Sequence, residues 1–258
     1  MSTENVTPEY TPGELMIAAA AREIRDRELV FVGMRLPLLA FLLARSTHAP
    51  RAVGLFENGV LRDTPAAAPL ITMSDPPNIR EARMCMGMET VMGLLQSGRV
   101  DLGFIGGAEV DRYGNLNTTE VGDGDRIVRL PGSGGACDIA CLAGRLVVVM
   151  KHERRRFVER VRHVTSPGYG LGGRWREDQG LVRGGPAAVI TDKAVFGFHP
   201  RTREMVLLSV HPGTSSEEVR DLTGWPLTLP PRPATTAEPT PVDLEVIRKY
   251  DPEGFWSR

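Results

Sequence analysis

Short, fully apolar runs alternate with segments of helical spacing along the first 150 residues, and this alternation limits the folds open to the chain. The runs are Leu29–Val32, Val53–Phe56, Leu102–Ile105 and Leu146–Met150. A run without polar positions suits a strand buried on both faces, as in a parallel sheet covered by helices. Helical spacing or helix-capping residues mark residues 11–27, 38–45, 88–96 and 135–143. The pattern predicts an α/β fold with an open, largely parallel sheet flanked by helices.

The second half of the chain changes character. Val189–Thr191, Val195–Phe198 and Met205–Val210 suit strands, but no long helices separate them. We therefore expect a more antiparallel C-terminal portion of the sheet, followed by a capped helix at residues 214–222.

The last part of the chain predicts an appendage. Residues 226–241 contain six prolines and few apolar side chains, which is typical of a linker or an arm that follows the surface. We expect residues 242–258 to add a short helix. We therefore divide the chain into a main domain, residues 1–225, and a proline-rich arm with a C-terminal helix, residues 226–258.

Composition narrows the function classes. The chain has 258 residues, 41% of them hydrophobic and 24% charged, and a net charge of −1, so no strong field attracts nucleic acid or an anionic membrane. The longest apolar stretch, Leu36–Ala44, is about half the length that spans a bilayer. The N-terminus lacks the features of a signal peptide, and three cysteines cannot all pair. We expect a soluble cytoplasmic protein that binds neither nucleic acid nor membrane.

Several candidate motifs have plain explanations. The five histidines are scattered without ligand spacing, so no metal site is expected. Residues 168–173 match G-x-G-x-x-G, but the polar residues 174–178 that follow are not the apolar helix of a dinucleotide site, and we interpret the segment as a flexible loop. The run Lys151–Arg156 suits a solvated face, with a seat for ligand phosphates as the alternative. Cys137 and Cys141 are interpreted as small buried hydrophobes.

Two segments suggest chemistry. Gly132-Ser133-Gly134-Gly135-Ala136 lets the backbone approach a ligand closely, and its amides suit a phosphate or the oxyanion of an acyl transfer, with a plain tight turn as the alternative. The second segment is Val53–Gly59, in which an apolar strand runs directly into Glu57-Asn58-Gly59. This places the Glu57 carboxylate at the carboxyl end of a strand, the edge at which open α/β sheets bind ligands. Taken alone, a loop glutamate is more often simply solvated.

With these motifs the sequence resembles the β subunit of family I CoA-transferases, and it is closest to the glutaconate CoA-transferase branch. Glu57-Asn58-Gly59 is similar to the nucleophile motif, and residues 132–136 are similar to the glycine motif beside the active site. The longer stretches that match are residues 104–111, 113–117, 152–157, 164–168 and 189–193. The resemblance extends to about Leu227. Phe56 and the loop of Arg62 and Asp63 depart from the pattern, as does the methionine-rich stretch 69–88, which leaves the acyl specificity open.

The resemblance implies a ping-pong exchange of CoA through Glu57. Glu57 would attack an acyl-CoA thioester to give a mixed anhydride, and the CoA thiolate would return to form a glutamyl-CoA thioester. A carboxylate needs no general base, but it is a weak nucleophile and depends on positioning and CoA binding energy. Gly134, Gly135 and Ala136 are implied as oxyanion donors. Asn58, Gly59 and Ser133 are further candidates for substrate contact.

The resemblance also implies a partner: an α subunit that completes the active site in a heterotetramer or hetero-octamer. No cofactor besides the CoA substrate, and no metal, is implied. Two alternatives stay open. One is a hydrolase, ring-opening enzyme or decarboxylase on the same fold, in which Glu57 acts as a general base. The other is a non-catalytic structural subunit.

Overall fold

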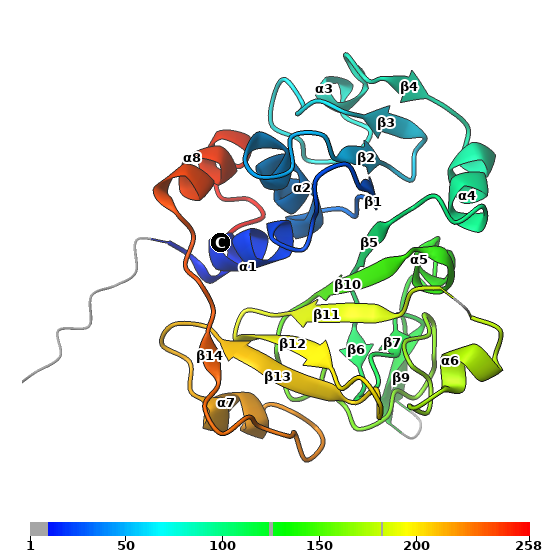
Figure 1. The fold of residues 1–258 in the computed structure, drawn as a ribbon, viewed down its shortest axis with the longest axis vertical. Helices are drawn as coiled ribbons and strands as arrows, with labels where there is room; N and C mark the ends of the chain where they lie inside the picture. Colours follow the sequence, from blue (N-terminus) through cyan, green and yellow to red (C-terminus); the bar gives the residue numbers. More distant parts are fainter. Residues whose placement is uncertain (1–9, 124–125, 182) are drawn as a thin grey trace, which may run out of the picture.

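The computed structural model describes residues 10–123, 126–181 and 183–258, which contain a ten-stranded sheet (Figure 1). The strand order is β14-β13-β12-β11-β10-β5-β1-β2-β3-β4. The strands of its parallel centre are β1 (Leu29–Phe31), β2 (Val53–Leu55), β5 (Leu102–Ile105), β10 (Arg145–Val149) and β11 (Pro186–Ile190). The predicted open, largely parallel sheet is confirmed.

Antiparallel strands extend the sheet on both sides. β12 (Ala194–Phe198) and β13 (Met205–Val210) follow β11, as expected for the C-terminal portion. On the other side, β3 (Val60–Arg62) pairs with β2, and β4 (Met84–Cys85) pairs with β3. This second antiparallel edge, which begins immediately after the Glu57 turn, was not predicted from the sequence.

Helices cover both faces of the sheet. α1 (Pro12–Ala21), α2 (Leu36–Ser46) and α8 (Pro241–Tyr250) lie on one face, and α4 (Met88–Gln96) and α5 (Ala136–Leu142) lie on the other (Figure 1). Successive residues of β10 alternate between the two hydrophobic cores: Val147 and Val149 pack on the α1 side, and Leu146 and Val148 on the α5 side. This two-sided burial explains why the strand sequence is an apolar run.

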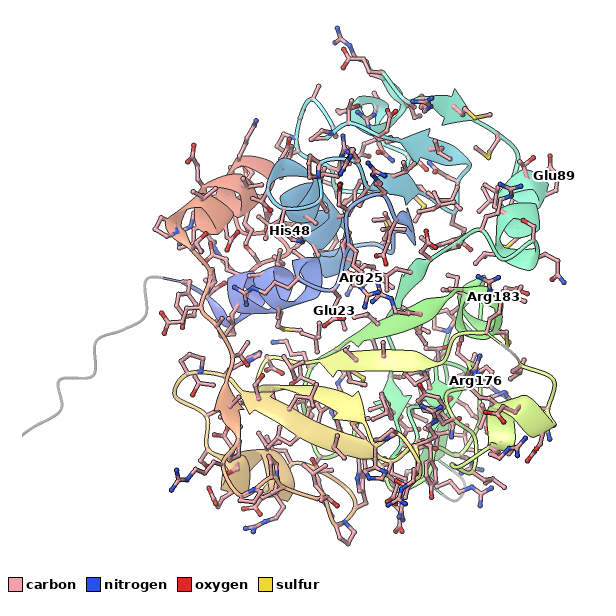
Figure 2. The ribbon with its side chains drawn as sticks, in the orientation of Figure 1. Glu23, Arg25, His48, Glu89, Arg176 and Arg183 are labelled. Atoms are coloured by element: carbon pink, nitrogen blue, oxygen red, sulfur yellow. The ribbon has the colours of Figure 1, made fainter. Side chains whose placement is uncertain are left out.

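The remaining elements are short. They are α3 (Pro76–Ile79), α6 (Trp175–Asp178), α7 (Ser216–Asp221), and two small hairpins, β6 (Glu109–Val110) with β7 (Leu116–Asn117) and β8 (Glu120–Asp123) with β9 (Arg126–Arg129). Arg176 of α6 is buried, and its guanidinium donates to the carbonyl of Arg183 (2.6 Å; both residues are labelled in Figure 2). Within the described residues, no helix has both the length and the apolar character needed to cross a membrane.

The first helix is shorter than expected. Its N-terminal capping box is present, with the Thr11 side chain accepting from the Glu14 amide, but α1 ends at Ala21 instead of near Arg27. His48, labelled in Figure 2, donates from Nε2 to the carbonyl oxygens of Ala21 and Ile24 (both 3.1 Å). The Ala21 carbonyl also accepts from the Ile24 amide (3.0 Å), so His48 holds the turn that follows the end of the helix.

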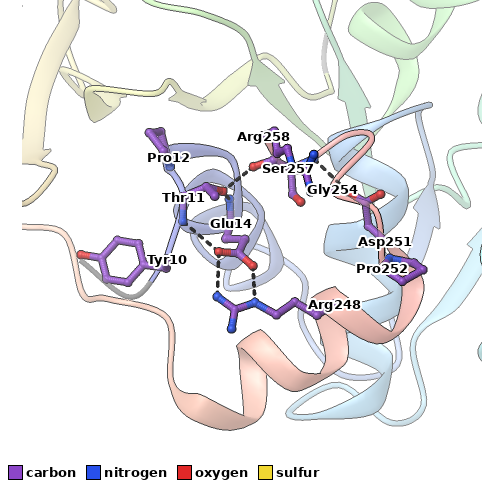
Figure 3. Close-up of a pocket in the computed structure, with 10 residues that line it drawn as sticks. All are labelled: Tyr10, Thr11, Pro12, Glu14, Arg248, Asp251, Pro252, Gly254, Ser257 and Arg258. Carbon is purple, nitrogen blue, oxygen red and sulfur yellow. Dashed lines mark hydrogen bonds and ion pairs between the residues drawn. The ribbon is translucent and has the colours of Figure 1, made fainter. Parts of the chain in front are cut away.

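The predicted arm is integrated into this fold. β14 (Ala234–Thr235) pairs in parallel with β13, and α8 packs against α1 and α2. Arg248 of α8 donates from Nε to Oε1 of the buried Glu14 at 2.7 Å, so the two ends of the described chain meet beside a shallow pocket (Figure 3). The segment after residue 225 therefore completes the helical layer over α1.

Candidate active site

Glu57 lies at the tip of a tight turn between β2 and β3. The Gly59 amide donates to the Phe56 carbonyl (2.9 Å), and the Phe56 amide donates to the Val60 carbonyl (2.8 Å). Phe56 is buried and meets the ring of Phe41 edge-on, which anchors the base of the turn. Glu57 and the exposed Asn58 are left as its two central residues, and Glu57 is only half-buried.

Gly59 is required by this turn. Its φ of +95° lies in the region that L side chains rarely adopt. A β-carbon at this position would also lie 1.8 Å from the carbonyl oxygen of Met86, whose amide donates to the Gly59 carbonyl (2.9 Å). A three-residue hairpin loop of this kind typically ends in a glycine with positive φ. Gly59 therefore shapes the turn that presents Glu57.

The glycine segment 132–136 forms a second turn, just before α5. Gly132 is fixed by Thr118, whose carbonyl accepts from the Gly132 amide and whose hydroxyl donates to the Gly132 carbonyl (both 2.8 Å). Gly134 has a φ of +51°. The Ser133 carbonyl accepts from the Ala136 amide (3.0 Å), and its hydroxyl oxygen accepts from the Cys137 amide (3.1 Å). The turn is therefore stabilised from within and from the loop that follows β7.

The structure brings the two predicted segments together. A β-carbon built on Gly135 would lie 2.9 Å from Oε1 of Glu57 and 3.1 Å from the terminal methyl of Met92 on α4. Glycine at 135 thus leaves the space into which the carboxylate and the methionine project. Within the described part of the chain, neither the Glu57 carboxylate nor the amides of Gly134 and Gly135 have a hydrogen-bond partner. An unpartnered carboxylate therefore lies against a turn in which the amides of Ser133, Gly134 and Gly135 are all unpartnered among the described residues.

The other candidate residues, Asn58, Gly59, Ser133 and Ala136, have structural partners. The Asn58 side chain donates to the Met73 carbonyl (2.9 Å) and to the Ser74 hydroxyl (3.3 Å). The Ala136 amide donates to the Ser133 carbonyl, as described above, so of the three predicted oxyanion donors only Gly134 and Gly135 have available amides. Contact of Asn58, Gly59 or Ser133 with substrate stays a prediction. Met92 was not predicted as a site residue. Only the fold, which packs the inner face of α4 against this turn, brings Met92 next to Gly135.

Two of the stretches that match the family, residues 104–111 and 113–117, supply a buried pair of side chains that supports a neighbouring loop. Asp111 accepts from the side chain of Asn115 (2.9 Å to Oδ2). Burial raises the pKa of Asp111, although this hydrogen bond opposes the shift. Asn115 Oδ1 in turn accepts from the amides of Gly168 and Gly170 (2.9 and 3.0 Å). The 168–173 segment, interpreted from sequence as a flexible loop, is therefore tied to this pair, and the four-residue helix α6 follows it.

The basic run 151–156 is used mainly for structure. His152 is buried, stacks on Phe157 with ring centroids 3.9 Å apart and donates from Nε2 to the Thr223 hydroxyl (3.2 Å). Burial lowers the pKa of His152 to about 4. Arg155 and Arg156 form ion pairs with Glu153. Across the described residues, no group of three His, Cys, Asp or Glu side chains is placed to hold a metal ion.

Sheet and site together define an α/β protein whose central feature is a carboxylate at the carboxyl edge of its parallel strands. The chain belongs to the coenzyme A transferase family, whose sequence profile matches residues 14–222.

Individual relatives cover almost the whole chain. It is 38% identical over 250 residues to the B subunit of 3-oxoadipate CoA-transferase from Pseudomonas knackmussii (94% of each chain). It is 34% identical over 251 residues to the B subunit of glutaconate CoA-transferase from Acidaminococcus fermentans (93% of this chain and 92% of the relative). The crystal structure of glutaconate coenzyme A-transferase from A. fermentans superposes with a TM-score of 0.89 at 30% identity, covering 97% of this chain and 98% of the other.

The same fold occurs in a protein with another activity. The decarboxylase AibA/AibB matches with a TM-score of 0.81 at 28% identity, covering 96% of this chain and 97% of the other. The predicted family is confirmed, and its B-subunit branch is supported by both of the relatives named above.

Proposed function

We propose that this chain is the catalytic B subunit of a two-subunit CoA-transferase, with Glu57 as its covalent nucleophile. The proposal rests on the position of the Glu57 carboxylate, which lies 2.9 Å from where a Gly135 β-carbon would be, next to the unpartnered amides of Gly134 and Gly135. A nucleophile needs access to substrate, and Glu57 is only half-buried at the tip of its turn. An oxyanion needs fixed donors, and two unpartnered amides lie on the adjoining turn.

The first half-reaction transfers CoA from the acyl-CoA donor to Glu57. A Glu57 oxygen attacks the thioester carbonyl of the acyl-CoA donor, and the resulting oxyanion is held by the Gly134 and Gly135 amides. The C–S bond breaks, which releases CoA thiolate and leaves an acyl-glutamyl anhydride. The thiolate attacks the glutamyl carbonyl of this anhydride, so the donor acid departs as its carboxylate and a glutamyl-CoA thioester remains.

The second half-reaction reverses this order with a new acid. The acceptor carboxylate attacks the glutamyl-CoA thioester and releases CoA thiolate, which then attacks the acyl carbonyl of the new anhydride. Acyl-CoA leaves and Glu57 returns as a carboxylate. The complete reaction neither takes up nor releases protons or electrons, and it uses no cofactor besides the CoA substrate.

The partner and the setting belong to the same proposal. Both relatives are named as B subunits, and the decarboxylase is named by two chains, AibA and AibB. We therefore assign this chain an α subunit that completes the site, in a cytoplasmic heterotetramer or hetero-octamer. The substrates are an acyl-CoA and a carboxylic acid, as in the names of the two relatives.

Kinetics of the co-expressed complex test the proposal. We expect parallel double-reciprocal plots, no turnover without a carboxylic acid acceptor, and inactivation by hydroxylamine only after incubation with acyl-CoA. Glu57→Ala is expected to abolish exchange while the subunits still co-purify. Full activity of Glu57→Ala would indicate a non-catalytic subunit.

A second candidate is a decarboxylase or hydrolase on the same scaffold, favoured by the match to AibA/AibB. In that reaction Glu57 would act as a general base on an acyl-CoA substrate. Turnover of acyl-CoA without any acceptor acid, with no hydroxylamine-sensitive intermediate, would establish this alternative.

A further inference from the structure

Arg62, at the end of β3, is a fully buried arginine whose partners are all oxygens of one segment. It is 1% exposed. The donors reach the carbonyl oxygens of Thr64 (3.2 Å), Pro65 (3.0 Å), Pro77 (3.1 Å), Asn78 (2.6 Å) and Arg80 (2.7 Å), and the Thr64 hydroxyl (3.5 Å). Every acceptor belongs to the connection between β3 and β4, residues 63–83, which we call the β3–β4 segment.

A buried charge of this kind is costly unless its donors are satisfied. Within the described residues, no carboxylate forms an ion pair with Arg62, so backbone oxygens satisfy its guanidinium. The planar group offers five donors in fixed directions, which a lysine ammonium cannot reproduce. Arg62 therefore fastens the start of the segment, Thr64 and Pro65, to its end, Pro77 to Arg80.

The β3–β4 segment, held by Arg62, also contacts the turn that carries Glu57. Asn78, whose carbonyl accepts from Arg62, is itself buried, and its side chain donates to the Met73 carbonyl (2.6 Å). The same Met73 carbonyl accepts from the side chain of Asn58 (2.9 Å), the neighbour of Glu57. A continuous chain of contacts therefore leads from Arg62 through Asn78 and Met73 to Asn58.

The surface beside this chain of contacts carries exposed apolar side chains among polar ones such as Thr72 and Arg80. Ile71 and Ile79 of the segment are 59% and 46% exposed, and Met88, at the start of α4, is 58% exposed. The Met92 methyl lies within about 3 Å of the same point over Gly135 as the Glu57 oxygen. Glu81 holds a φ of +61°, an uncommon conformation for a residue other than glycine, directly after the Arg80 carbonyl that Arg62 binds.

We propose that Arg62 is a positioning residue for acyl-CoA recognition, which holds the β3–β4 segment so that its exposed isoleucines contact the acyl chain beside Glu57. The inference rests on the proposed function for the identity of the substrate. The acyl group it selects carries an apolar chain that lies along Ile71 and Ile79. Arg62 touches no reacting atom and acts through the segment.

The test compares Arg62→Lys and Arg62→Gln in the co-expressed complex, with Arg145→Lys as the matched control. Arg145 is also a largely buried cation, paired with Glu28 (2.6 Å) and Glu23, but it lies at the amino end of β10, opposite the Glu57 edge (Glu23 is labelled in Figure 2). KM and kcat are measured with acetyl-CoA and with longer straight-chain acyl-CoAs. Hydrogen exchange of residues 64–82 is measured in the same preparations.

Arg62→Lys loses several donors, so we expect KM for the longer acyl-CoAs to rise about tenfold, with a smaller rise for acetyl-CoA and little change in kcat. Exchange in residues 64–82 is expected to accelerate in Arg62→Lys and not in Arg145→Lys. If Arg62→Gln fails to fold, the Arg62→Lys data decide alone.

Three results would overturn the inference: unchanged exchange in the segment, an equal KM change for every chain length, or loss of α-subunit co-purification without a change in acyl selectivity. The last result would make the segment a subunit contact. Failure of the proposed function is distinct, because it shows as a wild-type complex without a Glu57 adduct, whereas the exchange measurement does not depend on catalysis.

Discussion

The carboxylate of Glu57 occupies the space that a side chain on residue 135 would fill: Oε1 lies 2.9 Å from the position of a Gly135 β-carbon. The two residues come from separate motifs that lie far apart in the sequence. This close approach is the relationship on which the site depends, and it makes the site sensitive to a single methyl group at residue 135.

Gly135→Ala is predicted to lower kcat/KM by at least about tenfold, because the methyl displaces the flexible Glu57 carboxylate while the φ of −79° accepts alanine. Steady-state assays with a thermal unfolding curve check this. Gly93→Ala on α4 is the control, since nothing lies within 4 Å of its β-carbon position. Equal activity of the two variants would show that the Glu57 position is not critical.

Gly59→Ala is predicted to destabilise the chain by roughly 3 kcal/mol or more, because positive φ and a collision with the Met86 carbonyl act together. Gly213→Ala separates the two effects, since Gly213 has a φ of +81° and open space around it. We expect this control to cost about 1 kcal/mol in urea unfolding. Similar losses of stability in both variants would show that the collision with the Met86 carbonyl does not contribute.

Stability is predicted to fall as the pH is lowered from about 6.5 to about 4, because the pKa of His152 is depressed to about 4 in the folded state. In this window the unfolded chain binds a proton that the folded chain rejects, and above it the contribution is constant. The full loss amounts to about 3 kcal/mol. A charged imidazole would also carry a buried N–H at Nδ1, which has no partner among the described residues.

Urea unfolding at pH 7 and pH 5 measures this dependence. His152→Gln is expected to reduce the difference between the two pH values, whereas His163→Gln, at an exposed position, should leave it unchanged. Some dependence will remain, because burial also lowers the pKa of His211. An unaltered difference in His152→Gln would contradict the assignment.

Asn115→Asp is predicted to cost roughly 3 kcal/mol at pH 7, since it places a second carboxylate beside the buried Asp111. The loss should shrink at pH 5, where protonation relieves the repulsion. Asn115→Ala provides the comparison, because it removes the amide without adding charge. A loss for Asn115→Asp that does not change with pH would argue against the carboxylate pair.

The parallel centre of the fold was predictable from sequence because each strand is buried on both faces and therefore reads as an unbroken apolar run. The edge formed by β3 and β4 was not predicted. Asn58-Gly59 between two apolar runs is a strong hairpin signal, and it indicates β3 once Gly59 is recognised as the end of a turn. β4 has no such signal, because its two residues are exposed and its pairing depends on contacts made by the β3–β4 segment.

The candidate site was predictable in its parts but not in its assembly. The end of an apolar run predicted that Glu57 lies at the carboxyl edge of the sheet, where such folds bind ligands. The glycine content of residues 132–136 predicted a turn that a ligand can approach closely. The close approach of Glu57 to Gly135 depends on strand order and turn geometry, which no local pattern encodes. The engagement of the Ala136 amide by the Ser133 carbonyl is likewise a property of the folded turn.

Mass spectrometry of the peptide Ala52–Arg62 tests the central proposal most directly, because Glu57 is its only acidic side chain. The co-expressed complex is incubated with acyl-CoA, reduced with borohydride and digested with trypsin. We predict conversion of the Glu57 carboxyl to the alcohol, dependent on acyl-CoA and absent in Glu57→Ala. An unmodified peptide from a complex that is turning over under the same conditions would contradict this assignment.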